Sequence, residues 1–454
     1  MKRSRALCLI IVFLLISIGS LPARSGVPHL SYGFNVADWD VARLQSMGFN
    51  WIKVFEAPQS QLPQYVLLRV DANSSTSVSQ LLTDLDNKLV FKNYIDSWEI
   101  GNEVNIDAGY GWGAEPSVAA YKTLLCAAYT KIKSQDPSAI VVSAGLAPVG
   151  RSSNAHQIDE RVFIQQLLDT GGGACLDVVG FHPYGYSADY DAAPDVVSSD
   201  PTQNCDQGFC FRSAEKIYEV MQAYGAGDKK LWATEFGWIT QPPDNCLSDP
   251  SWSGRAWQIV SDDKQASNLV GAYQYADAHW PWMGAMFVFN LNFNMSPSYP
   301  ECEQVRYYSV QGRLAESALT NMPKNVASIP GNLKITPKSV FALIDVDWQP
   351  FTQTQPVYLM NYGWQTFAYT ATASASAPVV PALVNPTGVV SPTAQWPVFM
   401  QIGSSGRSIG VYTGTVTIVA SPGALGSPRT VPIELQVVEQ VYQTYLPLVA
   451  ANSP

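Results

Sequence analysis

The pattern of hydrophobic and polar positions divides the chain near residue 330. Before that point, short apolar runs rich in β-branched and aromatic residues alternate with stretches that repeat at helical spacing. After it, acidic residues and helix formers become rare, and Val, Thr, Ser, Pro and Tyr fill short alternating runs. The first pattern predicts an α/β fold, and the second predicts a smaller all-β domain behind it.

Eight strand-like runs precede the division. We expect strands at Tyr32–Val36, Trp51–Glu56, Tyr65–Asp71, Ser97–Glu103, Ile140–Ala147, Asp177–Tyr184, Lys230–Trp238 and Gly284–Leu291. Helices fit between most of them, at Val41–Met47, Ser117–Ser134, Arg161–Leu168 and Ser213–Tyr224. Eight such units in about 300 residues match a single parallel (β/α)8 barrel, or TIM barrel.

One connection does not fit this scheme. Only Ala57 to Gln64, with two prolines, joins the second predicted strand to the third. A crossover helix needs a dozen or more residues. Either this helix has been lost or the third strand is misplaced.

The first 25 residues have the features of a secretory signal. Lys2, Arg3 and Arg5 precede an apolar run from 6 to 21, and Ala23-Arg24-Ser25 offers small residues for cleavage. We therefore assign 1–25 to a signal peptide and 26–330 to the barrel domain. An uncleaved membrane anchor is the alternative, although the run is shorter than the roughly 20 residues of a membrane span.

Charge narrows the choice of partner. Removing the signal takes away Lys2, Arg3, Arg5 and Arg24 and no acid, so the formal charge falls from −10 by four to −14. An acidic chain is a poor match for nucleic acid. A neutral or weakly polar substrate outside the cell fits this charge better. No later segment is long and apolar enough for stable membrane insertion.

Six cysteines remain after the signal, which is an even set in an exported chain: Cys126, Cys175, Cys205, Cys210, Cys246 and Cys302. Disulfides are therefore expected. A disulfide between Cys205 and Cys210 could close one loop. A disulfide between Cys246 and Cys302 could join the loops after the last two barrel strands. Sequence alone allows 15 pairings of six cysteines. No histidine lies near paired cysteines at zinc-ligand spacing, so we expect no metal and no cofactor.

Two glutamates carry the candidate chemistry. Glu103 and Glu235 each end a predicted buried strand, the fourth and the seventh. A barrel places its active site at the carboxyl ends of its strands, and glycoside hydrolysis needs two carboxyl groups flanking one bond. Alone, an Asn-Glu pair arises by chance and Glu235 could be half of an ion pair. Two acids, each at a strand end, in a chain with eight predicted strands favour a catalytic role. Asn102, next to Glu103, could then donate a hydrogen bond to a sugar hydroxyl beside the reacting carbon.

Three motifs resemble those of the retaining glycoside hydrolases of clan A, which include cellulases, mannanases and xylosidases. The motifs are Gly101-Asn102-Glu103, Gly180-Phe181-His182-Pro183-Tyr184 and Thr234-Glu235-Phe236-Gly237, and the similarity covers roughly residues 30 to 325. The resemblance implies that Glu103 is the acid/base and Glu235 the nucleophile. It further implies that Asn102 binds the sugar 2-hydroxyl and that His182 and Tyr184 line the site.

Two positions depart from the family pattern. Lys53 stands where many members have an arginine that holds the nucleophile, and we expect it at the substrate site. The eighth strand reads Phe287-Val288-Phe289-Asn290, where a tryptophan that stacks on the substrate is common. The first departure bears on how Glu235 is held, and the second on the platform beneath the reacting sugar.

Other residues near the predicted mouth have two interpretations. Glu56 ends the second strand and is a rival for either catalytic role. Arg69 and Asp71 end the third strand, where they could reach substrate or form an internal ion pair in the lower barrel. His182 could hydrogen-bond into the catalytic network, and the alternative is a core histidine with satisfied hydrogen bonds, since it lies in an apolar run.

Aromatic residues crowd the predicted loops at the carboxyl ends of the strands, at Tyr110, Trp112, Tyr186, Tyr190, Trp238, Trp252 and Trp257. Sugar rings pack their apolar faces on aromatic planes, so these residues could form subsites. They could also close the small cores of their own loops. Trp112 and Trp238 are the preferred sugar contacts because they follow the two acids most closely.

The region 331–440 resembles the bacterial β-sandwich modules called BACON domains. Val411–Ile418 and Val431–Val438 alternate, and they follow Ile335-Thr336-Pro337 at the front of the region and Asn361-Tyr362-Gly363 midway. The resemblance implies glycan or mucin binding, or a spacer. Trp348, Trp364 and Trp396 could bind sugar or pack in the core, and the tail 441–454 receives no role.

The sequence thus predicts a secreted retaining glycoside hydrolase that cleaves β-linked O-glycosidic bonds in an oligosaccharide or polysaccharide. A catalytically inactive protein that binds glycan or adheres to surfaces is the alternative. That alternative explains the aromatic residues and the sandwich but leaves both strand-end carboxylates unexplained. The sugar, the linkage and the oligomeric state stay open.

Overall fold

The computed structural model describes residues 30–441, except 61, 138, 198–204, 325–330, 348–351, 362–364, 375–378, 381, 393, 405, 422–423 and 425. The proposed signal, most of the tail and two of the sandwich tryptophans, Trp348 and Trp364, lie outside the described residues. None of the helices in the described part is long and apolar enough to cross a membrane.

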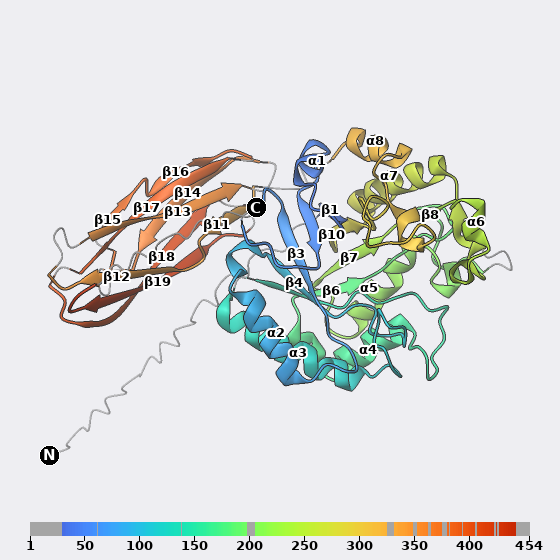
Figure 1. Ribbon diagram of the computed structural model, residues 1–454, viewed down its shortest axis with the longest axis horizontal. Coiled ribbons are helices and arrows are strands. Elements are labelled where there is room, and N and C mark those ends of the chain that lie inside the picture. The colour runs from blue at the N-terminus through green and yellow to red at the C-terminus, as the bar shows by residue number, and fades with distance from the viewer. Residues whose placement is uncertain are drawn as a thin grey trace, which may run out of the picture.

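Eight parallel strands close into a barrel, as the sequence predicted (Figure 1). They are β1 (Ser31–Asn35), β2 (Trp51–Val54), β3 (Tyr65–Val70), β4 (Ser97–Ile100), β5 (Ile140–Ser143), β6 (Val178–Phe181), β7 (Lys230–Phe236) and β10 (Met283–Val288). Each strand lies within or overlaps its expected range. Around the barrel their order is β1-β10-β7-β6-β5-β4-β3-β2, and β2 closes on β1.

Helices surround the barrel: α1 (Val41–Ser46), α2 (Val78–Leu89), α3 (Val118–Gln135), α4 (Glu160–Asp169), α5 (Ala214–Ala223), α7 (Asp262–His279) and α8 (Leu314–Asn321). The loop after β7 adds a short helix, α6 (Asp244–Leu247), and a two-stranded sheet of β8 (Ile239–Thr240) and β9 (Ile259–Val260). Between β2 and β3 the described residues contain no helix. Because β3 pairs in register with both β2 and β4, the crossover helix is lost and the strand is correctly placed.

Alternate residues of each strand point into the barrel. Near the amino ends of the strands the interior is apolar and holds Trp51, Tyr65, Trp232 and Phe287 in mutual ring contacts. One step further along β2 the inward residue is Lys53, a fully buried cation. The lower barrel is thus a packed hydrophobic plug, and the charged layer begins above it.

Three disulfides link the loops and helices of the barrel domain. Cys126 of α3 bonds to Cys175, Cys205 to Cys210, and Cys246 of α6 to Cys302. The two pairings suggested by the sequence are confirmed. The bond from Cys246 ties the loop after β7 to the loop after β10, two segments that flank the barrel mouth.

The all-β domain is a sandwich of two sheets, seen beside the barrel in Figure 1. One sheet has the order β11-β13-β17-β15 and the other β12-β19-β18-β14-β16. The strands are β11 (Leu333–Thr336), β12 (Val340–Asp345), β13 (Thr352–Asn361), β14 (Phe367–Ala373), β15 (Ala382–Val384), β16 (Thr387–Val390), β17 (Gln395–Gly403), β18 (Gly410–Ala420) and β19 (Arg429–Val438). The alternating runs 411–418 and 431–438 form β18 and β19, whose inward residues fill the core between the sheets.

The sandwich contacts the amino ends of the barrel strands through two ion pairs. Lys334 of β11 lies 2.6 Å from Asp96, the residue before β4, and its side chain is 2% exposed. Lys338 pairs with Asp136, at the end of α3, and its ammonium also donates to the Ile95 carbonyl at 2.8 Å. Both pairs are largely shielded from water, so removing one partner of either would leave a poorly solvated charge at the domain boundary.

Candidate active site

The two candidate glutamates lie at the mouth of the barrel. Glu235 belongs to β7 and is 6% exposed. Glu103 follows β4 after a turn at Gly101, whose φ of +84° is accessible to glycine without a steric cost. Glu103 itself has a φ of +43°, which is unusual for a residue with a side chain. Such strained conformations persist where surrounding structure enforces them, and they cluster at functional sites.

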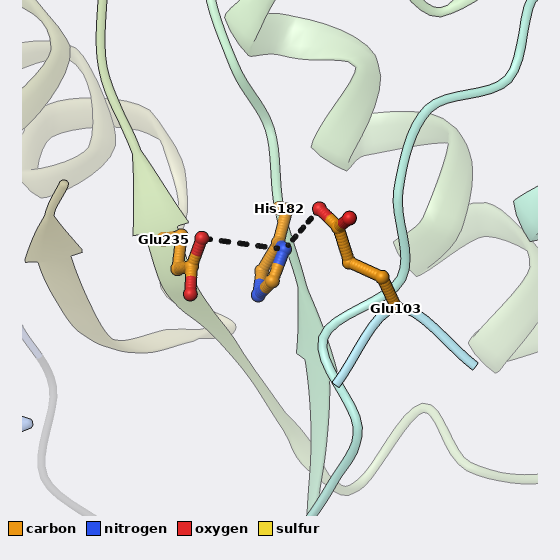
Figure 2. Close-up of side chains that lie close together, drawn as sticks. All are labelled: Glu103, His182 and Glu235. Atoms are coloured by element: carbon orange, nitrogen blue, oxygen red, sulfur yellow. Dashed lines mark hydrogen bonds and ion pairs between the residues drawn. The ribbon is translucent and has the colours of Figure 1, made fainter. Parts of the chain in front are cut away.

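His182, from the loop that follows β6, stands between the two glutamates (Figure 2). Its Nδ1 lies 2.9 Å from Oε1 of Glu103 and 3.7 Å from Oε2 of Glu235. One carboxylate oxygen of each glutamate and a ring nitrogen of the histidine all lie within 4.8 Å of one another. The structure therefore brings together three residues that are far apart in the sequence, as the strand-end argument predicted.

Glu235 is held by a hydrogen bond to each oxygen. Tyr184 donates its hydroxyl to Oε2 at 2.7 Å, and Lys53 donates to Oε1 at 3.1 Å. Burial alone would raise the pKa of Glu235, but His182, Lys53 and the Tyr184 bond together lower that pKa to about 2. The carboxylate is therefore ionised at neutral pH.

Glu99 is a buried member of this network that the motifs did not single out. Its Oε2 lies 2.7 Å from the Lys53 ammonium, and both side chains are fully buried. Its Oε1 accepts a hydrogen bond from the Gly145 amide at 3.3 Å. A sequence signal existed: Lys53 and Glu99 are opposite charges at inward positions of apolar strands, where an unpaired charge would be costly.

Gly145 leaves the space that His182 occupies. A Cβ at this position would lie 2.1 Å from Nε2 of the histidine and 2.4 Å from Oγ1 of Thr234. No other residue fits without displacing the ring. The close approach of this backbone fixes the histidine between the two carboxylates.

Asn102 lies beside Glu103 and is 9% exposed. Its Nδ2 donates to the Tyr110 carbonyl at 2.9 Å, whereas its Oδ1 is buried and has no hydrogen-bond partner. The sequence argument expected the amide group to donate to a sugar. In this geometry the unused atom is an acceptor, so Asn102 would receive a hydrogen bond from a sugar hydroxyl.

The two preferred tryptophans do not lie at the mouth. Trp112 is 3% exposed and packs edge-on against Tyr121 of α3. Trp238 is fully buried, and its Nε1 donates to the Ala188 carbonyl at 2.8 Å. Both indoles close the packing beneath their loops, so their assignment as sugar contacts is corrected here to core packing.

Partly exposed aromatic side chains surround the acids instead. Tyr308, from the turn after β10, has its ring centroid 5.3 Å from that of Tyr184 and 5.7 Å from that of Phe289. On another side, the rings of Tyr186 and Trp257 stack at 5.5 Å. Tyr308 was not predicted, because it lies 17 residues beyond Leu291, the end of the expected eighth strand, and only the fold brings it back to the mouth.

The other charged residues predicted near the mouth, Glu56, Arg69 and Asp71, lie outside the hydrogen bonds to Glu235. Glu56 is exposed, and no contact places it in the hydrogen-bonded network around Glu235. Arg69 pairs with Asp71 at 2.9 Å, and its guanidinium lies over the ring of Phe55. The two residues do pair, but at the mouth and with Asp71 largely exposed, so the expectation of an internal pair in the lower barrel is corrected.

Glu103, His182 and Glu235 have the ligand types and spacing that could hold a metal ion. Two observations oppose this use. The Lys53 ammonium sits 3.1 Å from Glu235 and would repel a cation, and both oxygens of Glu235 already accept hydrogen bonds. The positive charge beside Glu235 therefore disfavours a cation at this position.

No family model matches the chain, and no curated protein matches it. Among solved structures it is similar to an endo-β-1,3-glucanase of subgroup II of family GH128 from Sorangium cellulosum, with 14% identity over 65% of this chain and 99% of that one and a TM-score of 0.44. A subgroup I enzyme from Amycolatopsis mediterranei, in complex with laminaripentaose, has 15% identity over 64% of this chain and 99% of that one, with a TM-score of 0.41.

A third similar structure, β-glucuronidase 2 from Bacteroides uniformis, has 10% identity and a TM-score of 0.43. The match covers 90% of this chain but only 46% of the glucuronidase. These neighbours are glycoside hydrolases by description. At such identities the similarity concerns the fold alone.

Proposed function

We propose that this protein is a retaining glycoside hydrolase. The observation that carries the proposal is the pair of carboxylates, Glu103 and Glu235, with oxygens within 4.8 Å of each other and Glu235 ionised. Retaining enzymes hold their two carboxyl groups about 5–5.5 Å apart, whereas inverting enzymes leave about 6.5–9.5 Å for a water molecule. The short separation supports the retaining arrangement.

The first step transfers the sugar to the enzyme. An oxygen of Glu235 attacks the anomeric carbon while Glu103 gives its proton to the departing glycosidic oxygen. The carbon–oxygen bond of the glycoside breaks, and an ester bond to Glu235 forms. Lys53 and Tyr184 stabilise Glu235 as an anion before attack and as a leaving carboxylate afterwards.

The second step returns the enzyme to its starting state. Glu103, now a carboxylate, takes a proton from water, and the water oxygen attacks the anomeric carbon. The ester bond breaks and Glu235 leaves as a carboxylate, so two inversions give net retention. His182, whose Nδ1 lies 2.9 Å from Oε1 of Glu103, orients the Glu103 carboxyl group. The same nitrogen lies 3.7 Å from Oε2 of Glu235.

Asn102 and Tyr308 are the groups we assign to the reacting sugar. The free Oδ1 of Asn102 accepts from the hydroxyl next to the anomeric carbon, a bond that strengthens in the transition state. Tyr308 supplies the aromatic surface that the family resemblance would place on the eighth strand, where this chain has Phe289. The substrate is a β-linked oligosaccharide or polysaccharide.

Export and the second domain belong to the same proposal. We assign residues 1–25 to a cleaved signal, and the three disulfides suit an oxidising compartment outside the cytoplasm. The sandwich, assigned to 331–440 and likened to BACON modules, serves as a spacer or a second glycan contact. Trp396 of β17 is 43% exposed and is the tryptophan in the described part of this domain that can meet a sugar.

The test is release of reducing sugar by the mature protein from β-glucans, mannans, xylans, galactans and aryl glycosides. Glu235→Gln keeps the size of the side chain and removes the nucleophile, so hydrolysis should fall by at least about 10⁴-fold while binding remains. Glu103→Gln should strongly slow the hydrolysis of natural glycans. It should leave nearly unchanged the cleavage of aryl glycosides whose leaving groups need no proton. Glu219→Gln, at an exposed site on α5, is the control. Hydrolysis that survives in Glu235→Gln overturns the assignment.

A further inference from the structure

A polar groove opens beside the barrel mouth, away from the two catalytic carboxylates. It encloses about 390 Å³ and is lined by the ends of β2 and β3, the loop behind β3 and one side of α2. Phe55, Arg69 and Asp71 form its upper part, and Thr76 and Gln80 continue it along the start of α2.

Aromatic rings connect the groove to the nucleophile. Phe55 meets Phe293 edge-on at 6.2 Å, and Phe293 meets Phe289 at 5.2 Å. Phe289 contacts Tyr184 at 6.0 Å, and the hydroxyl of Tyr184 bonds to Glu235. In addition, the charge of Arg69 helps to lower the pKa of Glu235, although less than burial, His182, Lys53 and Tyr184 affect it. A continuous series of ring contacts therefore links the groove to the reacting centre.

The chemistry of the lining selects a class of ligand. Arg69 pairs with Asp71, and Lys88 pairs with Asp84, so the charges of the groove cancel in pairs. The Arg69–Asp71 pair offers donors and acceptors side by side, as vicinal hydroxyl groups require. Gln80 uses Oε1 to accept from Ser77, which leaves its Nε2 to donate. These groups suit a neutral, hydroxyl-rich molecule better than an anion or an apolar one.

We propose that this groove is a subsite for an uncharged sugar unit of the same glycan chain, one or more units away from the bond that is cleaved. This inference rests on the proposed hydrolase function and deepens it. It makes the protein an enzyme of extended neutral glycans, whose activity rises with substrate length. Phe55 and Gln80 are then specificity-determining residues, and neither touches the reacting bond.

The test compares kcat/KM along a series of neutral oligosaccharides of the hydrolysed glycan, from two to six units. In the wild type kcat/KM should rise with length, and Phe55→Ala should cut that rise by about tenfold. Gln80→Glu should do the same while it preserves the capping box of α2, since Glu accepts from Ser77 as Gln does. Phe341→Ala, an exposed phenylalanine of the sandwich, is the matched control and should keep the full rise.

Two results would overturn the subsite: the same rise in both groove variants as in the wild type, or an equal rise for oligosaccharides of uronic acids. If no glycan is hydrolysed at all, the proposed function fails, and the groove is tested separately by calorimetric titration of the whole protein with neutral β-glucan, mannan and xylan hexasaccharides. Binding that weakens in Phe55→Ala but not in Phe341→Ala supports the groove. Binding that is absent, or equal in both variants, overturns it.

Discussion

Lys53 and Glu99 form an ion pair of 2.7 Å inside the barrel, and neither side chain is exposed to solvent. The same ammonium lies 3.1 Å from Glu235, so one cation serves two carboxylates. Burying charges is costly unless they are paired and hydrogen-bonded. Under the proposed mechanism, Glu99 would hold the cation in place from the other side while Glu235 is esterified.

Replacing Lys53 should change the pH dependence of the reaction. The ammonium lowers the pKa of Glu235, so Lys53→Met should raise that pKa and move the acidic limb of kcat/KM to higher pH. We also expect kcat to fall by roughly 100-fold, as for the loss of one preorganised donor. Lys53→Arg keeps the charge and should restore the acidic limb in part. A pH–rate profile of each variant measures this, and an unmoved limb in Lys53→Met contradicts the role.

Gly145→Ala should inactivate the enzyme without changing any charged or hydrogen-bonding side chain. The new methyl group meets the His182 ring at a distance no real contact allows, so the ring must leave its place between the glutamates. A drop in kcat of at least tenfold is expected from this misplacement. Gly109→Ala, in the loop after β4, meets no atom within 4 Å and should stay within twofold of the wild type. Equal activities would show that His182 has no positioning role.

Glu160 should make the protein less stable as pH rises. Burial, and next the charge of Asp159, raise its pKa from 4.5 to about 7. The folded protein therefore holds this proton more tightly than the unfolded chain, and the cost of ionising the group grows from about pH 4.5 and is complete above about pH 7. At 1.36 kcal/mol per pKa unit the cost is up to roughly 3 kcal/mol.

Urea unfolding at pH 5 and pH 8 checks this expectation. Glu160→Gln should be more stable than the wild type at pH 8 and close to it at pH 5. Glu219→Gln, with its exposed side chain, should give the same difference from the wild type at both values. A pH-independent effect of Glu160→Gln would contradict the raised pKa.

The domain interface should depend on Lys338. Its partner Asp136 has a side chain 5% exposed, so Lys338→Met removes an ammonium from a carboxylate that water can barely reach. We expect a loss of about 3 kcal/mol in the free energy of unfolding. The double variant Lys338→Met with Asp136→Asn should recover part of this loss, since it also removes the buried charge. Thermal unfolding of the single and double variants gives the coupling, and strictly additive losses would exclude it.

Much of the fold was accessible to sequence patterns because the strands are short apolar runs with a period that the barrel enforces. Trp51 to Val54 and Val178 to Phe181 could be located in this way. The strand-end rule then brought Glu103 and Glu235 together. The missing helix after β2 was visible as a short connection with two prolines, and the structure shows that the barrel closes without it.

Side-chain exposure could not be predicted in the same way. Trp112 and Trp238 follow the acids closely in sequence, but the backbone after each acid turns inward and their indoles fill the layer beneath the loops. Tyr308 reaches the mouth from a segment whose course depends on the closure of the barrel. Proximity along the chain is a poor guide to proximity in a loop cluster, because tertiary packing decides which side chains are exposed to solvent.

The place where the sandwich is fastened has a practical consequence. Lys334 and Lys338 grip the amino ends of the strands, whereas Glu103 and Glu235 stand at the carboxyl ends. The length of the barrel separates these two regions. A bead, a biosensor surface or a cell envelope that holds the protein by its sandwich therefore leaves the entrance to the barrel open, and immobilisation at that end is the arrangement under which large insoluble substrates can still enter.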